Sequence, residues 1–449
     1  MIIAIENSFL FFRILTFIWI NRIIIFVKLY IAILKDVFFL TSDKKLGKGN
    51  FSVEKLFSSP IVCYLVPFIC LGGYLIYCIA ANKIPTPNGY YLIHYLYVYD
   101  HGFIARGLVG EVISWFAQTV TDEMIYGVMV AFNALLMISA SLCIGKALTK
   151  VRNDEKRFKY VLFLIIVLCV LPMTFKMYYS DMKLDKMLWA LTLFAVFLAD
   201  RKHGIWFVPF LCITATLVNP VFLFCSMILI SIILLQEFHS NGYSVKNGII
   251  CGISYISMIA IGLYGTIAEK WTGFATPEEF VDYYFSRYAS GLTEEVYHLF
   301  VTEWLFDYFE PLAGIFKTSF QIYFIEWGNG IKCILNFIFI ALPAYILLTL
   351  FWKKVMKAEN NKFQKFIYFL CAVSPIVIIP PVSISWEFSK YFYNNFTMQI
   401  CLIIFFIVGE HPAVLNAVED VLEHCKKHLL LSAAIISYFS ICCLYYVPV

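Results

Sequence analysis

Charged residues are scarce in this sequence, and their scarcity excludes an ordinary soluble globular protein. Only 14% of the 449 residues are charged, whereas 61% are hydrophobic and 18% are aromatic. A soluble globular protein is about 25% charged and about 45–50% apolar. Together with a mean hydropathy of +0.80, this composition is typical of an integral membrane protein.

Signatures of three kinds of binding site are also missing. No long run of lysine and arginine occurs, so we expect no nucleic-acid partner. No glycine-rich phosphate loop occurs, so nothing indicates a nucleotide-sugar site. No Cys-x-x-Cys and no His-Glu-x-x-His spacing occurs, so nothing indicates a zinc site. Almost all of the 14 cysteines lie inside apolar runs. We interpret them as small buried hydrophobic side chains rather than as disulfides or metal ligands.

Long apolar runs fill the rest of the chain. A membrane-spanning helix needs about 20 apolar residues, with a range of about 17–25. The sequence therefore predicts an all-α, polytopic transmembrane helix bundle. Three of its predicted spans (187–199, 204–218 and 221–236) are short, and such segments usually line a cavity that satisfies their backbone. The eleven predicted spans are 61–81, 124–146, 159–175, 187–199, 204–218, 221–236, 248–268, 331–352, 366–383, 393–409 and 428–447.

The N-terminal region has two interpretations. Residues 8–34 are strongly apolar but contain Arg13, Arg22 and Lys28, so they form either a twelfth span or an interfacial helix. Because no small-residue cleavage site follows a short apolar core, we do not expect a cleaved signal peptide. We divide the chain into an N-terminal apolar or interfacial segment with a basic cytoplasmic linker (1–59) and a transmembrane bundle (60–449).

The distribution of lysine and arginine predicts the orientation of the bundle. When residues 41–59 are placed in the cytoplasm, the cytoplasmic loops contain about twice as many of these residues as the opposite loops. This orientation places four polar segments and the enlarged loop 269–330 on the extracytoplasmic face.

The first polar segment runs from Tyr97 to Gly110, and an amphipathic helix is predicted over 103–116. Such a helix would lie in the plane of the membrane surface. In one interpretation Asp100 caps this helix, where the helix dipole favours an anion, and Arg106 meets a lipid phosphate. In the other, Asp100 is a catalytic base and Arg106 binds a substrate phosphate through its planar guanidinium.

The second segment is the hairpin 178–186. Asp181 and Asp185 are four residues apart and share a face if the segment is helical. Lys183 and Lys186 would either neutralise these carboxylates or bind a phosphate. A solvated loop with balanced charges is the alternative.

The remaining two segments are shorter. Asn219-Pro220 lies between two predicted spans, where a tight turn explains it without any function. Trp386, Glu387 and Lys390 lie before the span 393–409. The tryptophan suits the membrane interface, and the two charges either pair with each other or bind a ligand.

The loop 269–330 combines carboxylates with many aromatic residues. Sugar recognition needs both, because the C–H faces of a sugar stack on aromatic rings and carboxylates accept its hydroxyl protons. An amphipathic interfacial loop has the same composition, and both interpretations stay open. The aromatic residues include Trp271, Phe274, Tyr283, Tyr284, Phe285 and Tyr288.

These segments together resemble a known class of protein. The pattern Asp-x-Gly-Phe-x-x-Arg-Gly-Leu-x-Gly at 100–110 is followed by Asp181 and Asp185, by Asn219-Pro220, and by Trp386-Glu387-x-x-Lys390. In layout, residues 60–410 resemble bacterial polytopic envelope proteins of the GT-C-like glycosyltransferase and polysaccharide-polymerase type. The chain departs from this class at Asn219-Pro220, where a His-Glu pair is expected.

The resemblance implies an enzyme of cell-surface polysaccharide assembly in the bacterial cytoplasmic membrane, active on the extracytoplasmic face. It implies a polyprenyl-phosphate-linked sugar donor and a glycan acceptor, with membrane lipids and other polysaccharide-assembly proteins as further partners. No particular cofactor is indicated, and dependence on a divalent metal stays open because the scattered carboxylates define no ligand set. The implied catalytic residues are Asp100 and Asp181; the donor-phosphate residues are Arg106, Lys183 and Lys186; the substrate residues are His101, Asp185, Asn219, Trp386, Glu387 and Lys390.

Several functions stay open. Within glycosyl transfer, a repeat-unit polymerase and a monosaccharide transferase are close competitors. A lipid-linked saccharide flippase or other transporter would contain ionisable residues deep within its spans and matched halves. The predicted spans contain few such charges, and no matched halves are evident. A non-catalytic membrane assembly protein would tolerate substitution in all four polar segments.

Overall fold

The computed structural model describes residues 56–84, 89–170, 184–201, 203–268, 273–301, 317–318, 320–326, 329–384 and 388–446. Within these ranges the chain is helical, and the only β-type contact is an isolated bridge between Val120 and Tyr288. Six helices in the described part are long and apolar enough to cross a membrane. The predicted all-α, polytopic helix bundle is therefore confirmed.

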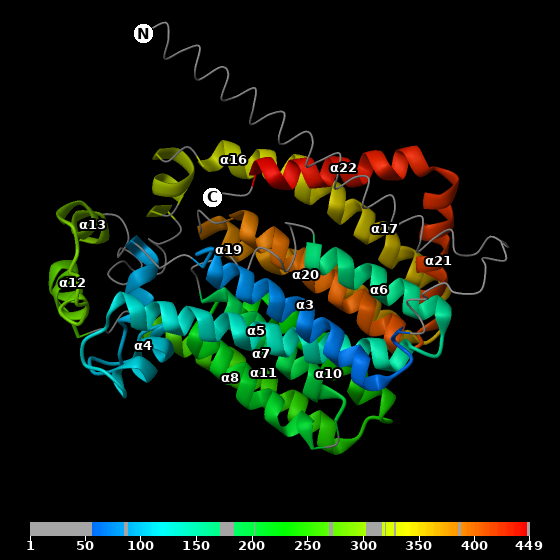
Figure 1. Ribbon diagram of the computed structural model, residues 1–449, viewed down its shortest axis with the longest axis horizontal. Coiled ribbons are helices and arrows are strands. Elements are labelled where there is room, and N and C mark those ends of the chain that lie inside the picture. Colours follow the sequence, from blue (N-terminus) through cyan, green and yellow to red (C-terminus); the bar gives the residue numbers. More distant parts are fainter. Residues whose placement is uncertain are drawn as a thin grey trace, which may run out of the picture.

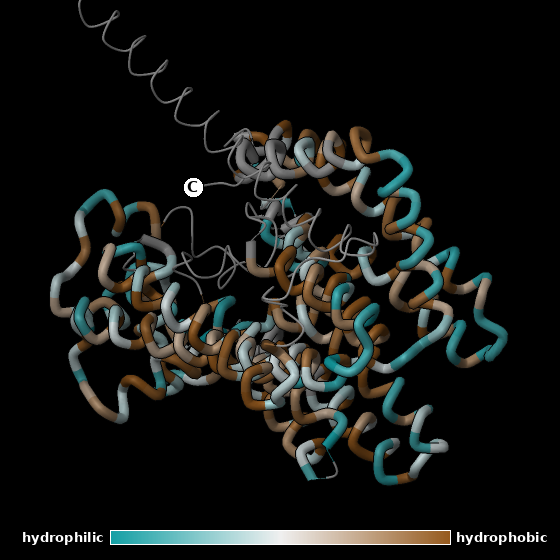
Figure 2. The backbone as a smooth tube through the Cα atoms, turned by 45° about the vertical axis from the view of Figure 1, so that its right-hand side comes forward, coloured by the Kyte–Doolittle hydropathy of each residue, from teal (hydrophilic) through white to brown (hydrophobic). Residues whose placement is uncertain are grey.

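The long helices run side by side through the molecule (Figure 1). Hydrophobic residues follow their length, and hydrophilic residues gather in many of the turns between them (Figure 2). Every one of the eleven predicted spans overlaps a helix. The main bundle helices are α3 (Pro60–Ala80), α5 (Asp122–Val151), α6 (Glu155–Val170), α7 (Asp185–Ala199), α8 (Val208–Val218), α10 (Met227–Ser240), α11 (Val245–Ala268), α17 (Leu342–Ala358), α18 (Lys362–Val373), α20 (Phe388–Val408) and α22 (Leu429–Tyr446).

Shorter helical pieces extend or connect these. Before α8 comes η3 (Gly204–Phe207), and before α10 comes α9 (Phe222–Cys225). The short helices α16 (Asn329–Asn336) and η7 (Phe337–Ala341) lead into α17. The short helices η8 (Ser374–Ile378) and α19 (Ile379–Ile384) follow α18. The π-helical turn η6 (Phe320–Glu326) lies between the enlarged loop and α16.

Two of the bundle helices, α7 and α20, lie in its interior. In the apolar window of α20, 72% of residues are buried, compared with 28% in α3. Buried side chains on α7 point in all directions and include Leu188, Trp189, Ala190 and Thr192. Because protein rather than lipid surrounds α7, this helix does not need the full length of a lipid-exposed span. The short predicted span 187–199 can therefore form a helix inside the bundle.

Polar side chains on α20 bind neighbouring helices across the bundle. The amide of Gln399 accepts a hydrogen bond from Trp352 Nε1 on α17 (2.7 Å) and donates to Ser374 Oγ at the end of α18 (2.5 Å). Hydrogen bonds of this kind, together with close packing, hold helices together where lipid supplies no hydrophobic driving force.

One end of the bundle is covered by short helices, and we call this part the cap (residues 89–121 and 273–301). It contains η1 (Gly89–Tyr95), α4 (Gly107–Ser114), α12 (Pro277–Phe285) and α13 (Glu294–Leu299), which Figure 1 shows beside one another. The other end, which we call the basic end, carries α21 (Pro412–Lys427). Ion pairs from Lys156 to Glu419 and from Lys354 to Asp420 attach α21 to α6 and α17.

The structure corrects the bounds predicted for the first cap helix. The helix extends over Gly107–Ser114 rather than 103–116, because Arg106 has a φ of 67° in the left-handed region, which a right-handed helix cannot contain. Gly102 has a φ of 111° and turns the chain again. Asp100 is thus separated from the helix by a turn, and the prediction that it caps the helix is wrong.

Glycine at position 110 allows α4 to lie directly on the backbone of the preceding loop. A Cβ atom there would be 2.8 Å from the Tyr97 nitrogen and closer still to the Tyr97 carbonyl oxygen. The next residue, Glu111, accepts a hydrogen bond from the Tyr99 backbone N–H (3.0 Å). These contacts fix the conformation of the loop that carries Asp100.

We predict that Gly110→Ala destabilises the protein by about 1–3 kcal/mol, the usual effect of overpacking. The added methyl group would push α4 away from Tyr97. Gly127→Ala on α5 is the matched control, because nothing lies within 4 Å of its Cβ position; there alanine should be neutral or slightly stabilising. Melting of the purified protein in detergent measures both, and equal melting temperatures would contradict the prediction.

Candidate functional site

Asp100 lies on the surface of the cap beside an aromatic group. Its Oδ2 accepts a hydrogen bond from the Tyr283 hydroxyl on α12 (3.0 Å), and the carboxylate is exposed. Burial and this carboxylate raise the pKa of the Tyr283 phenol, so the tyrosine stays a hydrogen-bond donor. The neighbouring His101 ring lies 4.3 Å from the ring of Tyr283 and 4.7 Å from that of Phe274.

Two segments far apart in sequence build this surface. Tyr284 donates a hydrogen bond to the Val98 carbonyl (3.3 Å), and its ring meets the Tyr97 ring edge-on at 5.0 Å. Further along, the Val120 N–H donates to the Arg287 carbonyl (2.7 Å). The first part of the loop 269–330 is therefore packed against residues 97–101 as one wall of the cap.

Arg106, expected to bind phosphate, is held inside the same cap. Its Nη1 lies 3.0 Å from Nε2 of His94, which is buried, and the Arg106 side chain is itself half-buried. Asp100 and Arg106 therefore have different protein partners, on α12 and η1 respectively. Both remain candidates at the cap.

A buried ion pair joins two of the predicted substrate residues. Asp185 at the start of α7 and Lys390 near the start of α20 lie 2.8 Å apart, with side-chain exposures of only 2% and 8%. Lys186, the next residue on α7, is fully buried. Since buried charges are expensive in an apolar bundle, they are a candidate functional site by default.

Residues on the short helices complete the surroundings of the ion pair. The Cys225 thiol on α9 is close enough to interact electrostatically with both Asp185 and Lys390. Asn219, which ends α8, uses its Oδ1 to accept a hydrogen bond from the Val221 backbone N–H (3.1 Å). In the described structure Asn219 thus forms the turn between α8 and α9, as its first interpretation predicted.

The ion pair belongs to a row of contacts between α7 and α20. One helical turn beyond Asp185 is Trp189, and one turn beyond Lys390 is Asn394. Trp189 Nε1 donates a hydrogen bond to Asn394 Oδ1 (2.6 Å). We call this row of two paired contacts the α7–α20 seam.

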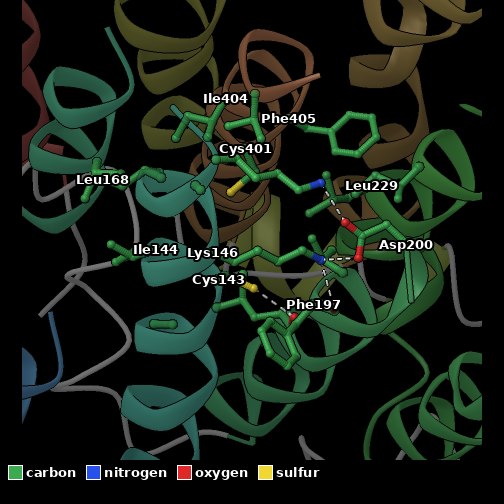
Figure 3. A pocket seen from close by; sticks show the side chains of 18 of the residues that line it. Cys143, Ile144, Lys146, Leu168, Phe197, Asp200, Leu229, Cys401, Ile404 and Phe405 are labelled. Carbon is green, nitrogen blue, oxygen red and sulfur yellow. Dashed lines mark hydrogen bonds and ion pairs between the residues drawn. The ribbon is translucent and has the colours of Figure 1, made fainter. Parts of the chain in front are cut away.

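A cavity of about 200 Å³ continues the seam toward the basic end (Figure 3). Trp189 and Thr397 line it where the seam ends, and its walls come from α5, α6, α7, α10 and α20. At the far side lie Lys146, Lys150, Asp200, Glu237 and His411. Asp200 accepts ion pairs from both Lys146 and Lys150.

Four predicted site residues lie outside the described residues: Asp181, Lys183, Trp386 and Glu387. The predicted site residues that the structure describes fall into two groups. Asp100, His101 and Arg106 lie in the cap. The second group lies at the ends of α7, α8 and α20 that face the cap, and consists of Asp185, Lys186, Asn219 and Lys390. Among the described residues, no group of three or more His, Cys, Asp or Glu side chains is placed to hold a metal ion.

The sequence did not indicate that Tyr283 is the partner of Asp100. It also did not indicate that Trp189 and Asn394 pair in the seam, or that Lys146 and Asp200 line a cavity. The spacing of Asp185 and Trp189, and of Lys390 and Asn394, is a usable signal, because residues four apart share a helical face. The spacing does not say which two helices face each other.

Comparison with known proteins supports the membrane assignment and adds no activity. Residues 64–218 match the family model described as uncharacterised membrane protein Rv1490. No curated protein and no solved structure matches the chain. The matched range runs from α3 to α8 and includes Asp100, Arg106, Asp185 and Lys186. Together with the six apolar helices, it indicates a multi-pass membrane protein.

We predict that Asp185→Asn destabilises the protein by about 3–5 kcal/mol, because it leaves the Lys390 ammonium group buried without its carboxylate. The double change Asp185→Leu with Lys390→Leu should recover most of this loss. Asp154→Asn is the control, since its ion pair with Arg157 is partly exposed and such pairs contribute about 0–1 kcal/mol. Heat denaturation in detergent distinguishes these cases; a double variant no more stable than Asp185→Asn would refute the pairing argument.

Proposed function

We propose that this protein is a glycosyl-transfer enzyme of cell-surface polysaccharide assembly, using a polyprenyl-phosphate-linked sugar at the cap. One observation carries the proposal: the exposed carboxylate of Asp100 is held by Tyr283, whose ring contacts the rings of both His101 and Phe274. Aromatic rings are suited to stack on the C–H faces of a sugar, and a carboxylate beside them is suited to accept a hydroxyl proton.

In the proposed reaction, an acceptor hydroxyl oxygen attacks the anomeric carbon of the donor sugar. The bond between that carbon and the phosphate oxygen breaks, and its electron pair leaves with the lipid phosphate. Positive charge develops on the sugar in an oxocarbenium-like state, as in glycoside hydrolysis. Asp100 takes the hydroxyl proton, while the Tyr283 hydroxyl on Oδ2 orients the carboxylate.

Cations near the cap would stabilise the departing phosphate. Arg106 is the candidate in the cap itself. The other two predicted phosphate residues are Lys186, at the start of α7, and Lys183, which lies outside the described residues. The end of α4 supports access from the membrane, because Trp115 and Phe116 are 69% and 82% exposed. Exposed aromatic residues of this kind favour the membrane interface, where a polyprenyl chain would approach the cap.

The proposal places the cap on the extracytoplasmic face of a bacterial cytoplasmic membrane. The abundance of lysine and arginine at the other end of the bundle supports this orientation. Lys150, Arg152, Lys156, Arg157 and Arg201 all lie in or beside turns at the basic end.

Transport is the second candidate function, and the buried ion pair favours it. The low number of charges within the predicted spans counted against a transporter. The structure, however, buries Asp185, Lys186 and Lys390 and places a cavity beyond them along the seam. A lipid-linked saccharide flippase or another transporter would use such charges along its pathway. Binding of substrate from the basic end, with no requirement for Asp100, would distinguish transport from transfer at the cap.

We predict that Asp100→Asn and Arg106→Ala each abolish sugar addition while the protein still inserts into the membrane. Surface glycan in a host that lacks its own copy of the gene, compared with protein abundance in membranes, measures the effect. Glu278→Gln is the matched control, because Glu278 is an exposed carboxylate on α12 and should be tolerated. Normal glycan from both variants would exclude catalysis at the cap and would favour a transporter or a non-catalytic assembly protein.

The orientation is tested separately by fusing reporters after residues 154 and 291. Alkaline phosphatase folds only outside the cytoplasm, so we expect it to be active after residue 291 and inactive after residue 154. Green fluorescent protein should show the opposite pattern. Reversal of both patterns would place the cap in the cytoplasm and overturn the proposed active face.

A further inference from the structure

A larger space than the cavity at the seam lies between α22 and the rest of the bundle, and we call it the α22 groove. It has a volume of about 1020 Å³ and is lined by α6, α17, α20, α21 and α22. Its apolar lining includes Phe163 on α6, Leu348 on α17 and Phe439 on α22. Protein interiors are close-packed, with few voids larger than a water molecule. A space of this size with an apolar lining therefore requires an apolar occupant.

Helix α22 is attached to its neighbours at separate points along its length. Near its start the Ser432 hydroxyl donates a hydrogen bond to the Cys425 carbonyl (3.4 Å), and further along the Tyr438 hydroxyl donates to the Phe339 carbonyl in η7. Figure 1 shows α22 at the edge of the molecule, beside α16. Groove-lining residues on α17 and α22 are partly exposed, with Leu347 at 49% and Ile435 at 38%. The groove is therefore open along its side, toward the surroundings of the bundle.

The length of the groove corresponds to one leaflet of a bilayer. Along α17 its lining runs from Ala344 to Lys354, which is about 15 Å at a rise of about 1.5 Å per residue. The hydrocarbon core of a bilayer is about 30 Å thick, so the groove covers about half of it. At the basic end the groove is bordered by α21, which crosses the ends of α6 and α17 in Figure 1.

Charges at the basic end of the groove neutralise one another. Four lysines and four carboxylates line the groove. Three of these lysines form ion pairs with carboxylates of the same lining: Lys156 with Glu419, Lys159 with Glu155, and Lys354 with Asp420. The lining therefore offers no excess of one sign, and its large apolar part identifies the ligand better than a headgroup charge does.

We propose that the α22 groove binds one phospholipid with two acyl chains, taken from the leaflet at the basic end. A cavity of about 150 Å³ holds the six carbon atoms of benzene, so on the same scale about 1020 Å³ holds about 40 carbons. Two acyl chains of roughly 16–18 carbons each, the length that forms a core of about 30 Å, fill this space. A single chain would leave about half of it empty. The two chains would join α22 to α6 and α20 across the groove.

The N-terminal region is the competing occupant, because residues 8–34 are apolar and lie outside the described residues. The described chain starts beside α6, where the ring of Phe57 lies 5.5 Å from that of Phe158. Tyr160, two residues after Phe158, lines the groove, and two residues turn an α-helix by about 200°. The chain therefore reaches α6 on the side away from the groove, which favours a lipid as the occupant.

The experiment uses the full chain in bacterial membranes, with the photoreactive residue 4-benzoylphenylalanine replacing Phe163 in the groove. Illumination joins this residue to C–H groups within its reach, and mass spectrometry identifies the adduct. Illumination is carried out in the membrane and again after purification in detergent. We expect a two-chain phospholipid on residue 163 in both cases. Ile256 on α11, which is 71% exposed, is the control; there the lipid adduct should form in the membrane and disappear in detergent.

Filling the groove tests the location. Leu347→Trp with Ile435→Trp adds two large side chains to the lining and should weaken retention of the lipid about ten-fold, an effect of the size expected from overpacking. Ile346→Trp with Leu430→Trp is the matched control on the same two helices, because both residues are exposed and lie outside the groove lining. Native mass spectrometry of the purified proteins measures retention, and we expect one lipid per chain in the unchanged protein and in the control.

Several outcomes would overturn the proposal. One is a lipid adduct at residue 163 that disappears in detergent as it does at residue 256, and another is equal lipid retention in the two double variants. Adducts to peptides of residues 1–55 would assign the groove to the N-terminal region, and adducts to a second copy of the chain would assign it to an oligomer contact. If the groove-filling variant fails to fold, the photochemical experiment still decides. None of these readouts depends on Asp100, so the proposal can fail or succeed independently of glycosyl transfer at the cap.

Discussion

The seam between α7 and α20 is the constraint on which the bundle depends. An ion pair with almost no exposure stabilises a structure only when its geometry holds both charges, and removing either partner leaves an uncompensated charge in an apolar interior. Asp185 and Lys390 are 205 residues apart, so their pairing requires the intervening helices to be correctly placed. The Trp189–Asn394 hydrogen bond fixes the same two helices one turn further on. The seam therefore specifies one register of α7 against α20.

The cap and the seam occupy the same end of the molecule but differ in chemistry. The cap presents an exposed carboxylate and aromatic rings, whereas the seam buries its charges. The Asp100 carboxylate is open to water, whereas the side chains of Asp185 and Lys390 are only 2% and 8% exposed. Removal of a proton from a substrate hydroxyl is therefore easier to assign to Asp100 than to Asp185.

Much of the fold was predictable from the sequence, because lipid imposes a strong rule on apolar segments. All eleven predicted spans overlap helices, including the short segment 187–199. The helix at 103–116 was predicted too long, since the periodicity of its apolar residues does not reveal the left-handed backbone at Arg106. Pairings between helices were not predictable either, because spacing shows which face a residue occupies and not which helix it meets. Asp185 and Lys390 were both singled out, but not as partners.

The packing of the cap has a consequence for how the protein is made. Residues 97–101 are held on one side by α4 and on the other by α12, whose rings cover Tyr97 and His101. During synthesis the ribosome delivers α12 only after α11, so the first loop waits for more than 170 residues before its second wall exists. A nascent chain that stops at α11 would display these aromatic rings uncovered. The cap can therefore close only after both of its segments have been synthesised.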